Sequence, residues 1–211
     1  MSSNKKSQLY YLPNNFCRSF LEALDHLAGK NGVSTVLNLA SLKKWTDAYP
    51  PDDLDKHIDF VDFAKINQSL EDVFGIKGGR SLSRQAGWAI FDHSLKTFPG
   101  MVEAVEDVQV DHSPEERFHL AINVLSDTLN EISDITSTTE ITQNETLISI
   151  TTCPVCWGRS ATSPTCSTLL GIIERNLAVF TDETEYAILE DDCIAAGDSG
   201  CVFIIRQNHQ K

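Results

Sequence analysis

The chain lacks several features that would assign it to a common class of protein. No stretch of eighteen or more apolar residues occurs in its 211 residues, so the sequence predicts no membrane span. The N-terminus is polar and lacks the apolar run of a secretory signal, which indicates a cytoplasmic protein. A dinucleotide fingerprint, a phosphate-binding loop and a nucleophile constellation are absent too. The sequence therefore names no catalytic residue, and it favours a non-enzyme while leaving that question open.

Basic residues are scarce, above all in the C-terminal half. The chain has 17 lysines and arginines against 30 aspartates and glutamates, a formal net charge of −13. Residues 1–110 are nearly balanced, with 12 basic and 14 acidic residues, whereas residues 111–211 have 5 and 16. Proteins that grip nucleic acid or anionic membranes present a basic face to the phosphates. We therefore expect neither nucleic acid nor a membrane surface as a partner.

Helical periodicity dominates the first two thirds of the chain. Apolar residues recur at helical spacing over four segments: 14–30, 60–74, 80–98 and 114–132. Ser113 and Glu116 have the spacing of a capping box before the last of these. Two further segments are less clear. Residues 32–40 fit a strand by composition and a helix by context, and the acidic residues 52–62 are predicted to form a solvated loop and a helix start.

Beyond residue 132 the pattern changes to strands separated by one helix. The expected order is a strand over 135–142, a strand over 146–152, a helix after Pro164, and strands over 185–190 and 201–206. This order predicts an α+β fold, a four-stranded and mostly antiparallel sheet covered by helices, with an N-terminal helical extension. We place the extension at residues 1–75 and a ligand-binding domain at residues 76–211.

Five of the six cysteines lie between Cys153 and Cys201. Cys166 falls at the start of a predicted helix, where the helix dipole favours a thiolate. Cys193 and Cys201 flank a turn sequence, and Glu190 precedes Cys193 by three residues. These four residues predict a tetrahedral metal site with three sulfurs and one oxygen, which suits Zn²⁺.

Cys153 and Cys156 offer a rival pairing. Their spacing is common both in zinc knuckles and in dithiol redox sites, but the second Cys-x-x-Cys of a knuckle is absent. The pair is therefore a candidate for metal binding, for redox chemistry or for contact with a ligand. Inert burial in the core stays open as a fourth interpretation.

The cysteine-rich segment resembles a known family, the vinyl-4-reductase-like domain. The resemblance is carried by the Cys153–Arg159 stretch, by Cys166 before a helix, and by the Glu190–Phe203 stretch. It is strongest over about residues 130–205. The family includes sensor modules of phenol-responsive activators, an accessory protein of bacteriochlorophyll synthesis, and a related fold in a vesicle-transport complex.

The resemblance implies a function. In the phenol sensors a zinc ion braces a buried pocket for an apolar ligand, and Cys166, Glu190, Cys193 and Cys201 match those ligands in spacing. The chain is accordingly predicted to be a stand-alone, zinc-braced sensor or carrier. It would bind an apolar small molecule and act through a protein partner, with a homodimer as one form. The alternatives are an enzyme or accessory protein of tetrapyrrole metabolism, and a Cys-x-x-Cys redox switch.

Three residues outside the ligand set are candidates for the pocket. Trp88 lies on the predicted central helix, and its alternative is packing against the sheet. Trp157 follows a predicted strand, where a tryptophan is more often a core residue. Arg159 could bind an anionic ligand or pair with the acidic surface of the protein.

Overall fold

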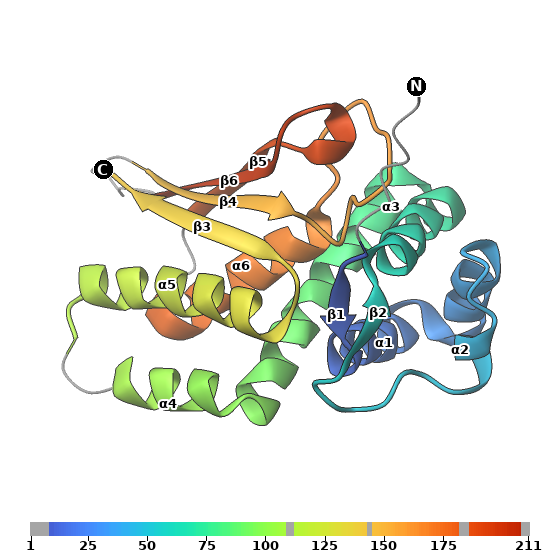
Figure 1. The fold of residues 1–211 in the computed structure, drawn as a ribbon, viewed down its shortest axis with the longest axis horizontal. Coiled ribbons are helices and arrows are strands. Elements are labelled where there is room, and N and C mark those ends of the chain that lie inside the picture. Colours follow the sequence, from blue (N-terminus) through green and yellow to red (C-terminus); the bar gives the residue numbers. More distant parts are fainter. Residues whose placement is uncertain (1–8, 109–111, 143–144, 182–185, 208–211) are drawn as a thin grey trace, which may run out of the picture.

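The computed structural model describes residues 9–108, 112–142, 145–181 and 186–207. Its main feature is a four-stranded sheet in the order β3-β4-β6-β5, with every neighbouring pair antiparallel. Two helices cover one face of this sheet (Figure 1). The strands are β3 (Thr136–Ile141), β4 (Thr146–Thr152), β5 (Tyr186–Asp192) and β6 (Cys201–Gln207), and the helices are α5 (Pro114–Ile132) and α6 (Ser167–Thr181). The predicted α+β class and its sheet are confirmed.

The alternating sequence of β4 decides which side chains face the helices. Ile148 and Ile150 are buried, while the residues between and after them are more exposed. In the antiparallel register Ile148 lies opposite Phe203 and Ile150 lies opposite Cys201. Because paired residues point to the same side of a sheet, this register turns the Cys201 side chain toward the core.

Two long helices, each with one break, form the rest of the molecule. They are α1 (Asn14–Leu39) and α3 (Phe60–Thr97), interrupted at Gly29 and Gly75, where φ is +74° in both cases. Glycine tolerates this left-handed conformation, which ends a run of helical hydrogen bonds. The predicted helix ends therefore appear as kinks, and the ambiguous segment 32–40 is helical as far as Leu39.

A small two-stranded sheet was not predicted. It pairs β1 (Tyr11–Pro13) with β2 (Lys56–Asp59), inside the segment expected to be a loop. Strands of three and four residues are too short to show a period of two, and their partners lie more than forty residues apart in sequence. The prediction of a helix start holds, because the Asp59 carboxylate accepts the Val61 N–H and α3 begins at Phe60.

The two central helices cross where both have glycine. A Cβ atom on Gly87 of α3 would overlap the Thr168 carbonyl, and one on Gly171 of α6 would overlap the Arg84 carbonyl. The backbones of α3 and α6 are thus in direct contact, with no room for a side chain. The contact positions α6, whose first residue follows Cys166, against the N-terminal half of the molecule.

The remaining elements complete one continuous core. Short helices α2 (Lys44–Asp47) and α4 (Pro99–Val108) flank the long ones, and a three-residue 3-10 turn, η1 (Ile194–Ala196), precedes β6. The Ser113–Glu116 capping box is confirmed at the start of α5. Buried side chains from both sides of residue 75 belong to one apolar cluster. The domain boundary at residue 75 stays a prediction. Among the described helices, none has the length and apolarity needed to cross a membrane.

Candidate metal centre

Six metal-binding side chains from four parts of the chain meet at one end of the sheet. Cys153 and Cys156 follow β4, Cys166 precedes α6, and Cys201 begins β6. Glu190 lies near the C-terminal end of β5, and Cys193 follows that strand directly. All five cysteines are free thiols and have no exposed surface.

The sulfur atoms lie within contact distance of one another. Cys166 Sγ is 3.4 Å from Cys153 Sγ, 3.6 Å from Cys201 Sγ and 3.8 Å from Cys193 Sγ. Cys156 Sγ is 3.4 Å from Cys201 Sγ. A tetrahedral ion with metal–sulfur bonds of about 2.3 Å separates its sulfur ligands by about 3.8 Å, so these spacings suit four-coordinate metal binding.

Glu190 has one oxygen anchored and one without a partner. Its Oε2 atom accepts the Cys166 N–H at 2.7 Å, whereas its buried Oε1 atom has no hydrogen-bond partner. Burial, and then the charge of Cys193, raise the pKa of this carboxyl to about 8. A buried carboxylate oxygen without a partner is costly, and a cation among the thiols would supply one.

The cluster contains no protein cation to balance thiolates. Burial raises the pKa of the Cys153 and Cys166 thiols. Among the described residues, no hydrogen bond or ion pair joins a lysine, arginine or histidine to any of the six donors. The polar support comes from neutral groups, such as the Ile194 N–H that points to Cys201 Sγ at 3.5 Å and the Thr165 hydroxyl at 3.9 Å from Cys193 Sγ. Ionised thiols here therefore need a bound cation.

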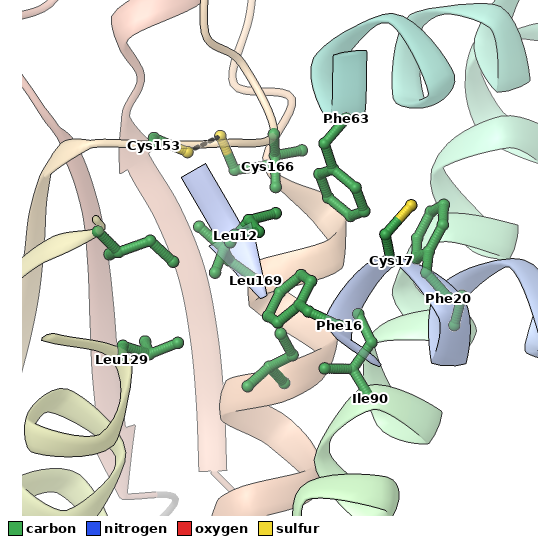
Figure 2. Close-up of a cluster of buried hydrophobic side chains, with 14 of the residues drawn as sticks. Leu12, Phe16, Cys17, Phe20, Phe63, Ile90, Leu129, Cys153, Cys166 and Leu169 are labelled. Carbon is green, nitrogen blue, oxygen red and sulfur yellow. Dashed lines mark hydrogen bonds between the residues drawn. The ribbon is translucent and has the colours of Figure 1, made fainter. Parts of the chain in front are cut away.

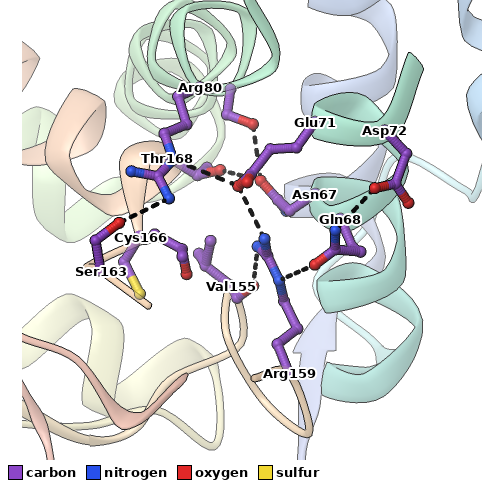
Figure 3. Close-up of polar contacts among 12 residues, drawn as sticks. Asn67, Gln68, Glu71, Asp72, Arg80, Val155, Arg159, Ser163, Cys166 and Thr168 are labelled. Atoms are coloured by element: carbon purple, nitrogen blue, oxygen red, sulfur yellow. Dashed lines mark hydrogen bonds and ion pairs between the residues drawn. The ribbon is translucent and has the colours of Figure 1, made fainter. Parts of the chain in front are cut away.

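Arg159 is part of a buried ion pair beside the cluster (Figure 3). Its Nη2 atom is 2.8 Å from Glu71 Oε1, and the two side chains are 5% and 10% exposed. It also donates to Gln68 Oε1 and to the Val155 carbonyl. The observed partner is a buried carboxylate and not the acidic surface, and the role of Arg159 toward a ligand stays a prediction. The pair ties the loop that holds Cys153 and Cys156 to α3.

The two tryptophans lie apart from each other. Trp88 is 41% exposed, and its indole N–H donates to Glu174 at 3.2 Å. Trp157 packs edge-on against Tyr10, with ring centroids 5.0 Å apart. Neither lines the cavity described next, and their pocket role stays a prediction.

An apolar cavity lies between the helices, away from the thiols. Its volume is about 20 Å³. This suffices for about one water molecule, far below the several hundred Å³ of a typical ligand pocket. The lining residues are Phe16, Ile90, Phe91, Ser94, Met101, Leu125, Thr128, Leu129, Ile132 and Ile172. No cysteine of the cluster is among them, so the thiols do not brace the walls of this cavity.

The sixth cysteine, Cys17, belongs to a different environment. Figure 2 shows it on α1 beside Phe20 and Phe63, apart from the Cys153–Cys166 contact. It is fully buried, and burial raises the pKa of its thiol above the ordinary range. Cys17 is a core residue in this structure.

Comparison with known proteins shows what the fold resembles. No protein-family model matches the chain, and no curated protein matches it. Similar solved structures include an H-NOX protein from K. algicida, at 14% identity and a TM-score of 0.60, covering 94% of this chain and 97% of that one. The match to an H-NOX protein from S. oneidensis has 11% identity and a TM-score of 0.58, and it covers 94% of this chain and 100% of that one. The match to an oxygen-binding H-NOX domain related to soluble guanylate cyclases has 12% identity and a TM-score of 0.56. It covers 92% of this chain and 93% of that one.

These findings correct the predicted family and function. The similar structures are H-NOX proteins, not vinyl-4-reductase-like domains, so the family prediction is wrong. The zinc-braced sensor of an apolar molecule is wrong with it, as are the tetrapyrrole and redox-switch alternatives. The prediction of Zn²⁺ as cofactor is also wrong, because the similar structures are described as those of heme proteins. Short cysteine motifs constrain local geometry and not ancestry, so their spacing did not identify the family.

The fold thus raises the question of whether heme fits this chain. Heme iron takes one or two axial ligands from His, Cys, Met or Tyr. Of the ten residues that line the apolar cavity, Met101 alone offers such an atom, and none is basic to meet the porphyrin carboxylates. Six donors at the cysteine cluster exceed the two positions that a porphyrin leaves open. Neither the described apolar cavity nor the cysteine cluster therefore fits heme, although the chain shares the fold of H-NOX structures.

Proposed function

We propose that this chain is a metal-thiolate sensory domain. The cysteine cluster, Cys153, Cys156, Cys166, Glu190, Cys193 and Cys201, binds a thiophilic metal ion, and the occupancy of the cluster sets the conformation of the surrounding loops. One observation carries the proposal, namely the convergence of five fully buried thiols and an unpartnered carboxylate oxygen. Thiolates in tetrahedral spacing select soft metals over Mg²⁺ or Ca²⁺.

The position of the cluster supports a sensory role. Its ligands come from the end of β4, the loop before α6, the end of β5 and the start of β6. A bound cation joins these segments, while without it the Glu190 Oε1 atom stays buried without a hydrogen-bond partner. Two states of the loops therefore differ in free energy according to metal binding, as a sensor requires.

The shared fold supports the same class of role with a different ligand. One similar solved structure is an oxygen-binding H-NOX domain, and another addresses the mechanism of H-NOX activation. We infer that this chain likewise converts ligand binding into a conformational signal, read by a protein partner.

Elemental analysis of the full chain, purified without oxygen, tests the proposal. We expect at least one equivalent of a thiophilic metal per chain. Removing it with a chelator should speed hydrogen exchange of the amides in residues 153–166 and 190–201, with α1 unchanged. Hemin added to the metal-free protein should give no shifted Soret band. A metal-free protein with the exchange pattern of the loaded one, or a stoichiometric hemin complex, would overturn the proposal.

A further inference from the structure

The six donors of the cysteine cluster form two overlapping sets of four. One set is Cys153, Cys156, Cys166 and Cys201, and the other is Cys166, Glu190, Cys193 and Cys201. Within each set all donor atoms lie within 4.8 Å of one another. Cys166 and Cys201 belong to both sets, so each of them lies between the two halves of the cluster.

This arrangement exceeds what one ion can use. A tetrahedral ion takes four ligands, and six donors would leave two without a metal. Two tetrahedra that share one edge have six corners, which equals the number of donors present. The shared edge would be the Cys166–Cys201 pair, whose sulfurs are 3.6 Å apart, close to the edge length of about 3.8 Å for metal–sulfur bonds of about 2.3 Å.

Charge favours the same count. Five thiolates and one carboxylate carry six negative charges, in a place where the five cysteines have no exposed surface. One divalent ion would leave four of these charges uncompensated, and two ions would leave two. Burial of unpaired charge is strongly unfavourable, so the second ion stabilises the ionised cluster.

We infer that the cysteine cluster is a binuclear site, in which Cys166 and Cys201 bridge two thiophilic divalent ions. Cys153 and Cys156 complete the coordination of the first ion, and Glu190 and Cys193 complete that of the second. This inference rests on the proposed function and deepens it. It gives the Cys153–Cys156 pair a role as terminal ligands of the all-sulfur ion, while Glu190 makes the other ion a three-sulfur, one-oxygen site. Each thiol loses its proton to solvent on binding, and the Glu190 carboxyl, where protonated, does the same.

Cadmium-113 NMR of the full chain tests the inference. The metal-free protein is titrated with ¹¹³Cd²⁺ under reducing, oxygen-free conditions. We expect two bound equivalents and two resonances, one typical of four sulfur ligands and the other of three sulfurs and an oxygen. The double variant Cys153→Ser/Cys156→Ser should retain one equivalent and only the second resonance. Cys17→Ser, a matched change of a buried thiol outside the cluster, should retain both.

The outcomes separate this inference from the proposed function. A single equivalent in the native chain, unchanged in the Cys153→Ser/Cys156→Ser variant, would overturn the binuclear site and leave a mononuclear one at Glu190 and Cys193. No bound cadmium would overturn both. Should the double variant not fold, the native spectrum alone decides, because one resonance contradicts the inference and two resonances support it.

Discussion

Ser113 and Glu116 illustrate how single residues fix the start of a helix. The Ser113 hydroxyl accepts the Glu116 N–H, and the Glu116 carboxylate accepts the Ser113 N–H at 2.8 Å. The hydrogen bond from the Ser113 backbone, followed by that from its hydroxyl, lowers the pKa of Glu116 below its ordinary value of 4.5. A lowered carboxyl pKa stabilises the folded state above the unfolded pKa, and this contribution disappears as the pH falls through the folded pKa.

We therefore expect the difference in stability between the native chain and Glu116→Ala to vanish in acid. Urea unfolding at neutral pH and at about pH 3 measures the difference, and an NMR titration of Glu116 gives its pKa directly. In Ser113→Ala the pKa of Glu116 should rise toward 4.5, because the hydroxyl and its hydrogen bond are lost. An unchanged pKa in that variant would contradict the account.

Arg159 acts at the residue scale on the cysteine-bearing loop. Replacing Arg159 with Met leaves the Glu71 carboxylate buried, at 10% exposure, without its nearest cation. Loss of one partner of a buried pair costs about 3–5 kcal/mol, and we expect the lower end because Arg80 Nε stays 3.6 Å from Glu71. Arg206→Met is the matched control. Its pair with Glu145 is exposed, so its cost should be below about 1 kcal/mol.

Denaturant unfolding of the two variants measures both costs. Equal and small effects would mean that the Arg159–Glu71 pair is solvated and does not hold the loop to α3.

At the scale of elements, the crossing of α3 and α6 depends on glycine. Gly171→Ala places a Cβ against the Arg84 carbonyl, which forces the helices apart. Overpacking of this kind costs about 1–3 kcal/mol or more. Gly78→Ala is the control, because its Cβ would meet Phe74 Cβ at 3.4 Å, an ordinary contact. That change should be neutral or stabilise α3 by up to about 1 kcal/mol, since alanine favours a helix.

Thermal unfolding of the two glycine variants distinguishes them. A Gly171→Ala chain as stable as the native one would show that the helices can separate without loss. The crossing also fixes the position of Cys166, because this residue directly precedes α6.

At the scale of the whole molecule, metal binding and folding are linked. A metal that binds only the folded chain adds about 2.7 kcal/mol of stability at one hundred times its Kd. We expect the melting temperature of the native chain, and of Cys17→Ala, to rise on metal addition. Cys201→Ser removes a bridging ligand and should lose most of that rise. Calorimetry with and without metal checks this, and an equal rise in all three chains would point to binding elsewhere.

How much of this could be predicted from sequence depends on the range of the interaction. The Ser113 capping box, the helix ends at Gly29 and Gly75, and the alternation in β4 follow from contacts within a few residues. The pairing of β1 with β2 and the glycine contacts of α3 with α6 do not. They join residues far apart in the chain, and no local pattern marks them.

The candidate site divides in the same way. Spacing alone grouped Cys166, Glu190, Cys193 and Cys201, which the structure brings together. It left Cys153 and Cys156 undecided, because their place depends on how β4 pairs with β6 and how the loop packs on α3. The same motifs suggested a family and a cofactor that the similarity to H-NOX structures corrects.

The sequence by itself determined the longer helices, the four strands of the main sheet, the acidic composition and the concentration of thiols near the C-terminus, since these follow from composition and local periodicity. Only the tertiary structure decided that five sulfurs and one carboxylate share a buried site, and that the described apolar cavity is too small for a porphyrin. The physical reason is that coordination and cavity size depend on atoms brought together by long-range packing. Neighbouring residues in the chain fix the direction of a side chain but not which distant donor it meets.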